Sequence, residues 1–209
     1  MKKLDFKKAW VHLYKPSEKT PSIIDVPRMK FLMIDGAGDP NTSQQFREAV
    51  QALYGVAYTI KFSFKKERKP KGFFEFVIPP LEGLWWMDGD GEFDQEKKAA
   101  WRWTLMIMQP EYVTKTKVKQ ATQTLQKRNG DAALPLIRFE AFKEGKCVQI
   151  FHRGSYANEG PNIAKMETYA KERNFSFCGK HHEIYMSDPR RVKPERWKTI
   201  LRHPIEKKK

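Results

Sequence analysis

Residues 24–62, IDVPRMKFLMIDGAGDPNTSQQFREAVQALYGVAYTIKF, read as a strand, a turn and a helix in succession. From 24 to 34 the side chains alternate, so that Leu32 and Ile34 fall on one face and Phe31 and Met33 on the other. The strand stops at the turn 35–40. Thr42 or Ser43 can then cap a helix over 43–61, whose apolar residues recur every three or four positions.

The same order of elements is predicted to occur twice along the chain. Strands at 73–87 and 99–108 complete a first strand-helix-strand-strand module, which spans 24–108. A second module, 136–205, contains a strand at 147–153, a helix at 161–172 and strands at 180–186 and 198–205. We therefore predict an α+β fold in which tandem modules form antiparallel sheet, with helices on one side and a ligand cleft between the halves.

Segments outside the two modules complete the predicted organisation, in which 24–205 is a single domain. Residues 1–23 are expected to form a leader that packs on the domain, and 206–209 a basic tail. A helix over 111–129, with Pro110 in its first turn, is predicted to link the modules. Between 136–142 and 147–153 the sequence Glu144-Gly145-Lys146 predicts a hairpin turn.

The composition limits the partners without naming one. Forty Lys plus Arg against 25 Asp plus Glu give a net charge of +15, but the basic residues are scattered along all 209 positions. There is no apolar signal core and no membrane-spanning window, so we expect a cytoplasmic protein. The leader lacks the helices of a DNA-binding module, so no such module is expected. Gly36-Ala37-Gly38 lacks the third glycine of a dinucleotide-binding motif, and no cofactor is expected.

The stretch 178–189, CGKHHEIYMSDP, holds a thiol, two imidazoles and a carboxylate close together. If it is a strand, His181, Glu183 and Tyr185 share one face, while His182 points to the other. Adjacent histidines that point apart, and a Cys178 without a Cys-x-x-Cys partner, do not make a structural zinc site, so we expect no metal. Glu183 is then left to face either water or a cleft.

Aromatic residues favour the cleft, because the chain has six Trp, seven Tyr and 14 Phe, more than a core of this size needs. Trp85 and Trp86 are neighbours in a strand and must face opposite ways, whereas Tyr54 and Tyr58 lie one helical turn apart, as either core or cleft residues. A carboxylate walled by aromatic rings attracts cationic and flat aromatic ligands, and it can also accept a proton from water. Binding and catalysis both remain open.

Three motifs in order resemble the GyrI-like small-molecule-binding family over 24–205. They are LYGVAYTIKF at 53–62, PPLEGLWW at 79–86 and HHEIYMSDPRRVKPERWKTILRHPI at 181–205. The resemblance implies tandem strand-helix-strand-strand modules and an aromatic pocket with Glu183 at its floor. In relatives fused to DNA-binding modules, this domain senses effectors for multidrug-responsive regulators, whereas this chain is expected to stand alone.

The motif LEGLWW is similar to a stand-alone branch with cyclopropanoid cyclopropyl hydrolases, which open the cyclopropane ring of DNA-alkylating toxins. That resemblance implies that Glu183 acts on the attacking water and that Tyr185 donates a proton. The residues expected to bind the ligand are Tyr54, Tyr58, Trp85, Trp86, Trp103, His181, Glu183 and Tyr185. Three hypotheses follow: a binding protein for flat aromatic or cationic xenobiotics, a hydrolase using the same pocket, or an interaction module that docks on an acidic protein.

Overall fold

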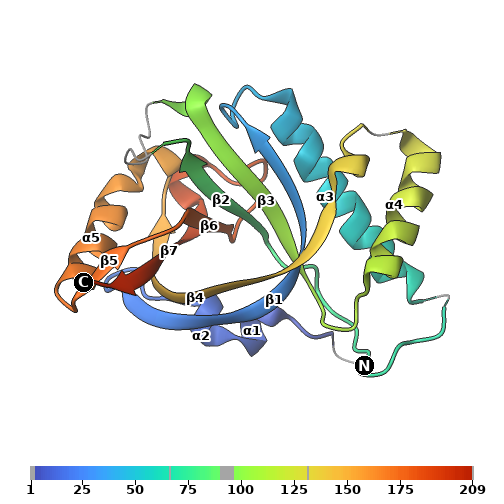
Figure 1. The fold of residues 1–209 in the computed structure, drawn as a ribbon, viewed down its shortest axis with the longest axis horizontal. Helices are drawn as coiled ribbons and strands as arrows, with labels where there is room; N and C mark the ends of the chain where they lie inside the picture. The colour runs from blue at the N-terminus through green and yellow to red at the C-terminus, as the bar shows by residue number, and fades with distance from the viewer. Residues whose placement is uncertain (1–2, 66, 90–96, 131, 209) are drawn as a thin grey trace.

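A computed structural model of the chain describes residues 3–65, 67–89, 97–130 and 132–208. In these residues seven strands form one antiparallel sheet in the order β4-β1-β3-β2-β6-β7-β5, and a further pairing of β4 with β7 closes it into a ring (Figure 1). The strands are β1 (Ser22–Ala37), β2 (Leu81–Met87), β3 (Trp101–Gln109), β4 (Arg138–Arg153), β5 (Phe175–Phe177), β6 (His181–Tyr185) and β7 (Lys198–Lys207). Among the strands of the described residues, only β5 lies outside the ring, paired with the end of β7.

Closure gives the sheet an inner and an outer face. All six strands of the ring contribute to one buried cluster, here called the inner cluster, which includes Phe31 and Met33 of β1. Leu32 and Ile34 of the same strand belong instead to a cluster beneath α3 (Gln44–Ser63) and α4 (Lys115–Asn129). The predicted alternation of β1 is therefore confirmed, with one set of side chains inside the ring and the other under a helix.

The helices divide between the two faces. On the outer face, α3 packs on β1 and β3, and α5 (Gly160–Lys171) packs on β4 and β7, at opposite flanks of the sheet in Figure 1. The leader forms two single-turn helices, α1 (Phe6–Ala9) and α2 (Val11–Tyr14), whose Phe6, Leu13 and Tyr14 join the inner cluster. None of the described helices is long and apolar enough to cross a bilayer.

Local sequence signals account for the helix boundaries. Ser43 caps α3, because its Oγ accepts the backbone N–H of Phe46 at 3.1 Å. The predicted helix at 111–129 begins later, since Thr114 is the residue that caps α4, with its Oγ1 3.2 Å from the N–H of Lys117. It ends as predicted before Gly130, which has a positive φ of 64°.

The predicted hairpin at Glu144-Gly145-Lys146 is wrong, because 138–153 is the single strand β4. Gly145 does have a positive φ of 80°, but the chain bends there and does not reverse. Both arms pair with β1 in one continuous register, from Ile23 opposite Val148 to Met33 opposite Arg138. Gly145 thus allows the 16-residue strand β4 to bend while it stays paired with β1 around the ring.

The order of elements repeats, as β1–α3–β2–β3 and then β4–α5–β6–β7, with β5 between α5 and β6. The two sets are joined on both sides, by β1 with β4 and by β2 with β6, so the sheet is not split into two halves. Strand 73–87 is shorter than predicted, because only 81–87 belongs to the sheet. The predicted tail at 206–209 begins inside β7, which runs on to Lys207.

Candidate functional site

The outer face of the seam between β2 and β6 carries the residues of the predicted site. Gly83 pairs with Glu183, and Trp85 pairs with His181, so these four residues share a face together with Tyr185. Trp85 belongs to the cluster under α3, which identifies this face as the outer one. Glu183 is largely buried, with only 12% of its side chain exposed. The sequence left open whether Glu183 faces a cleft or water. In the structure its side chain is largely buried, between α3 and α5.

A hydrogen bond bridges the seam above Glu183. The indole Nε1 of Trp85 donates to the hydroxyl of Tyr185 at 3.1 Å. Gly83 lies directly beneath, and a Cβ at that position would stand 2.8 Å from the indole nitrogen and 2.9 Å from the hydroxyl. The glycine of the LEGLWW motif is thus required so that two aromatic side chains can meet over the carboxylate.

A second carboxyl group completes the site. Glu159, the residue that precedes α5, is 2% exposed and hydrogen bonded to Glu183. Burial, reinforced by the charge of Glu183, raises the pKa of Glu159 well above its ordinary value. Burial and the neighbouring charge therefore favour the protonated form of Glu159, which can donate a hydrogen bond to Glu183.

Tyr185 supplies a further hydrogen bond to Glu183, and its pKa is raised by burial and then by the charge of that carboxylate. Its hydroxyl thus stays protonated and lies between the indole of Trp85 and the carboxylate. His181 stands close by, with Nε2 3.6 Å from the nearer oxygen of Glu183. Ligand-type atoms of Glu159, His181 and Glu183 all lie within 4.8 Å of one another.

Aromatic rings surround this acidic centre. Tyr156 lies edge-on to Tyr185 at 5.8 Å and contacts Trp197 at 4.7 Å between ring centroids. On the other flank, Trp85 stacks on Phe46 at 6.0 Å and meets Trp101 edge-on at 5.4 Å. These rings come from β2, β3, β6, α3 and the segments before α5 and β7.

The remaining predicted ligand residues are dispersed. Trp86 faces away from Glu183, and the amine of Lys180 lies 3.2 Å from the centre of its ring. Trp103 is fully buried beneath α3, edge-on to Phe46. Tyr54 stacks on Tyr58, a residue of α3 that is 44% exposed. The structure thus gathers Trp85, His181, Glu183 and Tyr185, and leaves Trp86, Trp103 and Tyr58 outside this group.

The histidine next to the site serves a different face. His182 points into the ring, where its Nδ1 lies 2.9 Å from Glu144 and its Nε2 3.1 Å from Glu82. Arg202 also reaches Glu144, at 3.4 Å, and bonds Gln149 and the carbonyl of Leu13. We call Glu82, Glu144, His182 and Arg202 the inner ion network.

The inner ion network holds its charges tightly. Burial alone would lower the pKa of His182, but Glu144 and Glu82 outweigh burial and raise it to about 9. Burial likewise opposes ionisation of Glu144, yet His182 and Arg202 hold its pKa at about 2. His182 and Glu144 are therefore both ionised at neutral pH. The network links β2, β4, β6 and β7 across the ring.

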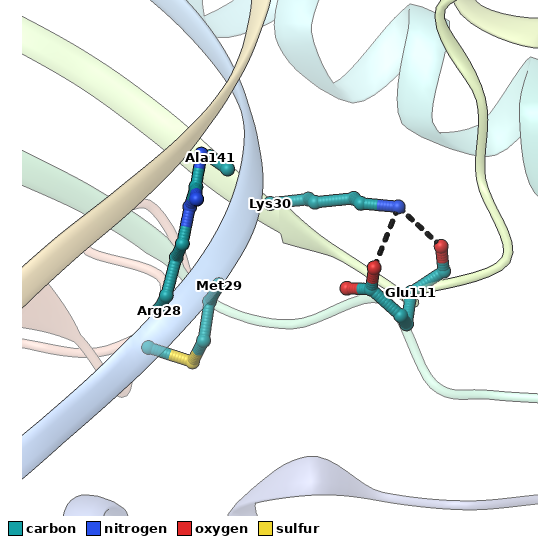
Figure 2. A pocket seen from close by; sticks show the side chains of 5 residues that line it. All are labelled: Arg28, Met29, Lys30, Glu111 and Ala141. Atoms are coloured by element: carbon teal, nitrogen blue, oxygen red, sulfur yellow. Dashed lines mark hydrogen bonds and ion pairs between the residues drawn. The ribbon is translucent and has the colours of Figure 1, made fainter.

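Two hollows on the surface lie away from Glu183. One of about 400 Å³ is lined by Arg28, Met29, Lys30, Glu111 and Ala141 (Figure 2). Its lysine is held by Glu111, with the amine 2.6 Å from the backbone carbonyl and 2.8 Å from the carboxylate. The other, about 490 Å³, opens near Met33, Leu84 and Lys180, among other residues on the inner side of the sheet. Neither is lined by Trp85, Glu183 or Tyr185.

Residues 19–206 match the model of the GyrI-like small molecule binding domain. The chain belongs to the GyrI-like family. A crystal structure of an uncharacterised conserved protein from Listeria innocua is 41% identical and superposes with a TM-score of 0.90, over 98% of this chain and all of that one. Another Listeria innocua protein, described as a hydrolase, is 40% identical with a TM-score of 0.89 and the same coverage.

A more distant structure shares the fold alone. The C-terminal domain of EcmrR is 10% identical, with a TM-score of 0.54, over 90% of this chain and 98% of that one. None of the curated proteins matches the chain. Membership in the GyrI-like family identifies a small-molecule-binding domain.

Two residues of the acidic centre, Glu159 and Tyr156, were not predicted from the sequence. Both lie in the segment before α5, which the sequence indicated only as the start of a helix at Pro161. An acidic residue just before a helix is common for electrostatic reasons and gives no sign of a site. Only the packing of α5 against β4 and β7 brings Glu159 to Glu183.

Proposed function

We propose that this protein is a cytoplasmic small-molecule-binding protein of the multidrug type, which takes flat aromatic or cationic xenobiotics at Glu183. The observation that carries the proposal is a buried carboxylate at the seam of β2 and β6, ringed by aromatic side chains and hydrogen bonded to a second carboxyl. Membership in a small-molecule-binding family supports it.

Recognition would combine charge and stacking. A ligand cation can displace the proton held on Glu159, so its positive charge is neutralised by the carboxylates inside the buried site. A flat ring stacks against the indole of Trp85 or the phenol of Tyr156, and each cation–π contact contributes about 0.5–2 kcal/mol. Tyr54 and Tyr58 on α3 would extend the aromatic surface toward solvent.

The test is binding of a cationic aromatic dye, followed by quenching of tryptophan fluorescence. Glu183→Gln keeps the shape and removes the charge, and we expect its Kd to rise at least tenfold, or about 1.4 kcal/mol. Glu167→Gln is the matched control, because Glu167 lies on the surface of α5 in an ion pair with Lys171. Equal affinity of the Glu183 variant and this control would refute the central role of the carboxylate.

Hydrolysis of a strained electrophile is the second candidate, favoured by the Glu183–Tyr185 hydrogen bond and by the Listeria innocua relatives described as hydrolases. In a cyclopropanoid toxin, Glu183 would take a proton from water as its oxygen attacks a ring carbon. The carbon–carbon bond breaks, and its electron pair moves to the activating group, which accepts a proton from Tyr185.

Turnover separates the two candidates. When catalytic amounts of protein are incubated with a cyclopropane-bearing alkylator, ring-opened product beyond one equivalent supports hydrolysis, and Tyr185→Phe should slow its formation. Loss of the alkylator that stops at one equivalent indicates sequestration and removes the hydrolase candidate.

A further inference from the structure

We propose that Glu159, His181 and Glu183 form a binding site for a divalent transition-metal ion such as Zn²⁺. The site goes beyond the proposed binding of organic ligands, although it uses the same carboxylate. It also departs from the expectation of no metal, which considered only residues between 178 and 189. The third ligand, Glu159, comes from a distant part of the chain.

The donor atoms converge as a metal requires. His181 and Glu183 alternate on β6 and therefore point to the same face, and Glu159 reaches them from the start of α5. Tetrahedral Zn²⁺ ligands at about 2.0–2.1 Å from the metal lie roughly 3.3 Å apart. The 3.6 Å between His181 Nε2 and Glu183 Oε1 is close to that separation, and the whole set lies within 4.8 Å.

One oxygen of the cluster is buried without a partner. Oε1 of Glu159 makes no hydrogen bond within the described part of the chain, and the residue is 2% exposed. No lysine or arginine of the described residues forms an ion pair with Glu159 or Glu183. A buried, unsatisfied carboxyl oxygen beside a second carboxylate is costly, and a cation placed between them removes that cost.

The donor set points to the class of metal. One imidazole nitrogen with two carboxylate oxygens suits Zn²⁺ and neighbouring transition metals, whereas Mg²⁺ and Ca²⁺ prefer oxygen ligands alone. Three protein ligands leave a fourth position for water, as in catalytic zinc sites. Tyr185, which bonds Glu183, would orient that ligand from outside the first coordination sphere.

Metal binding can be measured directly with Co²⁺, whose visible absorption reports coordination by protein ligands, followed by displacement with Zn²⁺. Chelator-treated protein should bind one equivalent, and Glu159→Gln should weaken binding at least tenfold. Glutamine has the shape of a protonated glutamate, so this variant is expected to fold, and circular dichroism checks that it does. Glu167→Gln on the same helix is the control and should bind as the wild type does.

A second variant guards against metal bound elsewhere on the surface. His181→Asn should also weaken Co²⁺ binding at least tenfold, because it removes the nitrogen ligand. Absence of binding to the wild type at micromolar Co²⁺ or Zn²⁺ overturns the proposal, as does binding that survives both substitutions. The dye assay for the proposed function is run in chelator, so the two ideas can fail independently. If both hold, Zn²⁺ should compete with the dye.

Discussion

Substitution of Gly83 by alanine tests the geometry of the site most directly. The backbone at Gly83 does not have a positive φ, so alanine fits the strand conformation. Its Cβ, however, would lie 2.8 Å from Nε1 of Trp85 and 2.9 Å from the hydroxyl of Tyr185. Both distances are well below van der Waals contact, so at least one ring must move.

The loss of stability in Gly83→Ala can be estimated from the displacement of the Trp85 and Tyr185 side chains. Trp85 is 3% exposed and packed against Phe46 and Trp101, so movement of its ring strains the cluster beneath α3 by about 1–3 kcal/mol. Separation of the indole and hydroxyl also loses a hydrogen bond of about 0.5–1.5 kcal/mol. Removal of glycine from a strand returns about 0.5–1 kcal/mol. The net destabilisation is about 2 kcal/mol.

Thermal unfolding followed by circular dichroism measures this effect. For a chain of this size, about 2 kcal/mol lowers Tm by roughly 4–8 °C. Thr116→Ala is the control, because Thr116 is exposed on α4, away from the site. It should be neutral or slightly stabilising, since alanine is the better helix former. A Gly83→Ala protein that melts at or above the wild-type temperature would falsify the placement of the Trp85–Tyr185 bond.

Three other measurements follow from the same structure. Gly36→Ala should destabilise more than Gly83→Ala, because its Cβ would lie 2.2 Å from the ring of the fully buried Trp103; a smaller loss in Tm contradicts this. Thr114→Ala should lower the free energy of unfolding by about 1 kcal/mol through loss of the α4 cap, and Thr116→Ala, outside the cap, should not. Stability in urea should be greatest between about pH 4.5 and 6.5. The raised pKa of His182 means that its contribution is complete below its ordinary value of 6.5 and is lost as the pH rises through about 9, whereas the contribution of Glu144 is complete above 4.5 and is lost as the pH falls toward 2. The alkaline loss, on the order of 1–3 kcal/mol, should shrink in His182→Leu, and an unchanged loss would assign it to other groups.

Features set by neighbouring residues could be predicted from the sequence. The alternation of β1, the Ser43 cap of α3 and the division of β6 into two faces each depend on residues a few positions apart, and all three are confirmed. Ring closure could not be predicted in this way, because the pairing of β4 with β7 depends on contacts between distant segments. Gly145 was misinterpreted for the same reason. A glycine with a positive φ is compatible with a hairpin turn and with a bend in a long strand, and the residues around it do not distinguish the two.

In the candidate site, too, local features could be predicted from the sequence, whereas features that depend on tertiary contacts could not. That Trp85 and Trp86 face opposite ways follows from adjacency in a strand, but which of them meets Glu183 depends on the register of β2 with β6. Trp103 was expected to bind ligand, and its full burial under α3 could be recognised only once α3 was placed on β3. Glu159 was missed because only tertiary packing brings it to β6.

The two faces of β6 explain how so short a strand can hold a site. On the outer face, His181, Glu183 and Tyr185 meet the aromatic rings, while on the inner face His182 is clamped between Glu82 of β2 and Glu144 of β4. The clamp holds β6 against β2, and this is the same seam at which Gly83 lies opposite Glu183. Groups that bind or react need supports that keep their geometry within fractions of an ångström. The inner ion network provides that support from behind the sheet, so loss of His182 should disturb the outer-face site although no ligand would touch this residue.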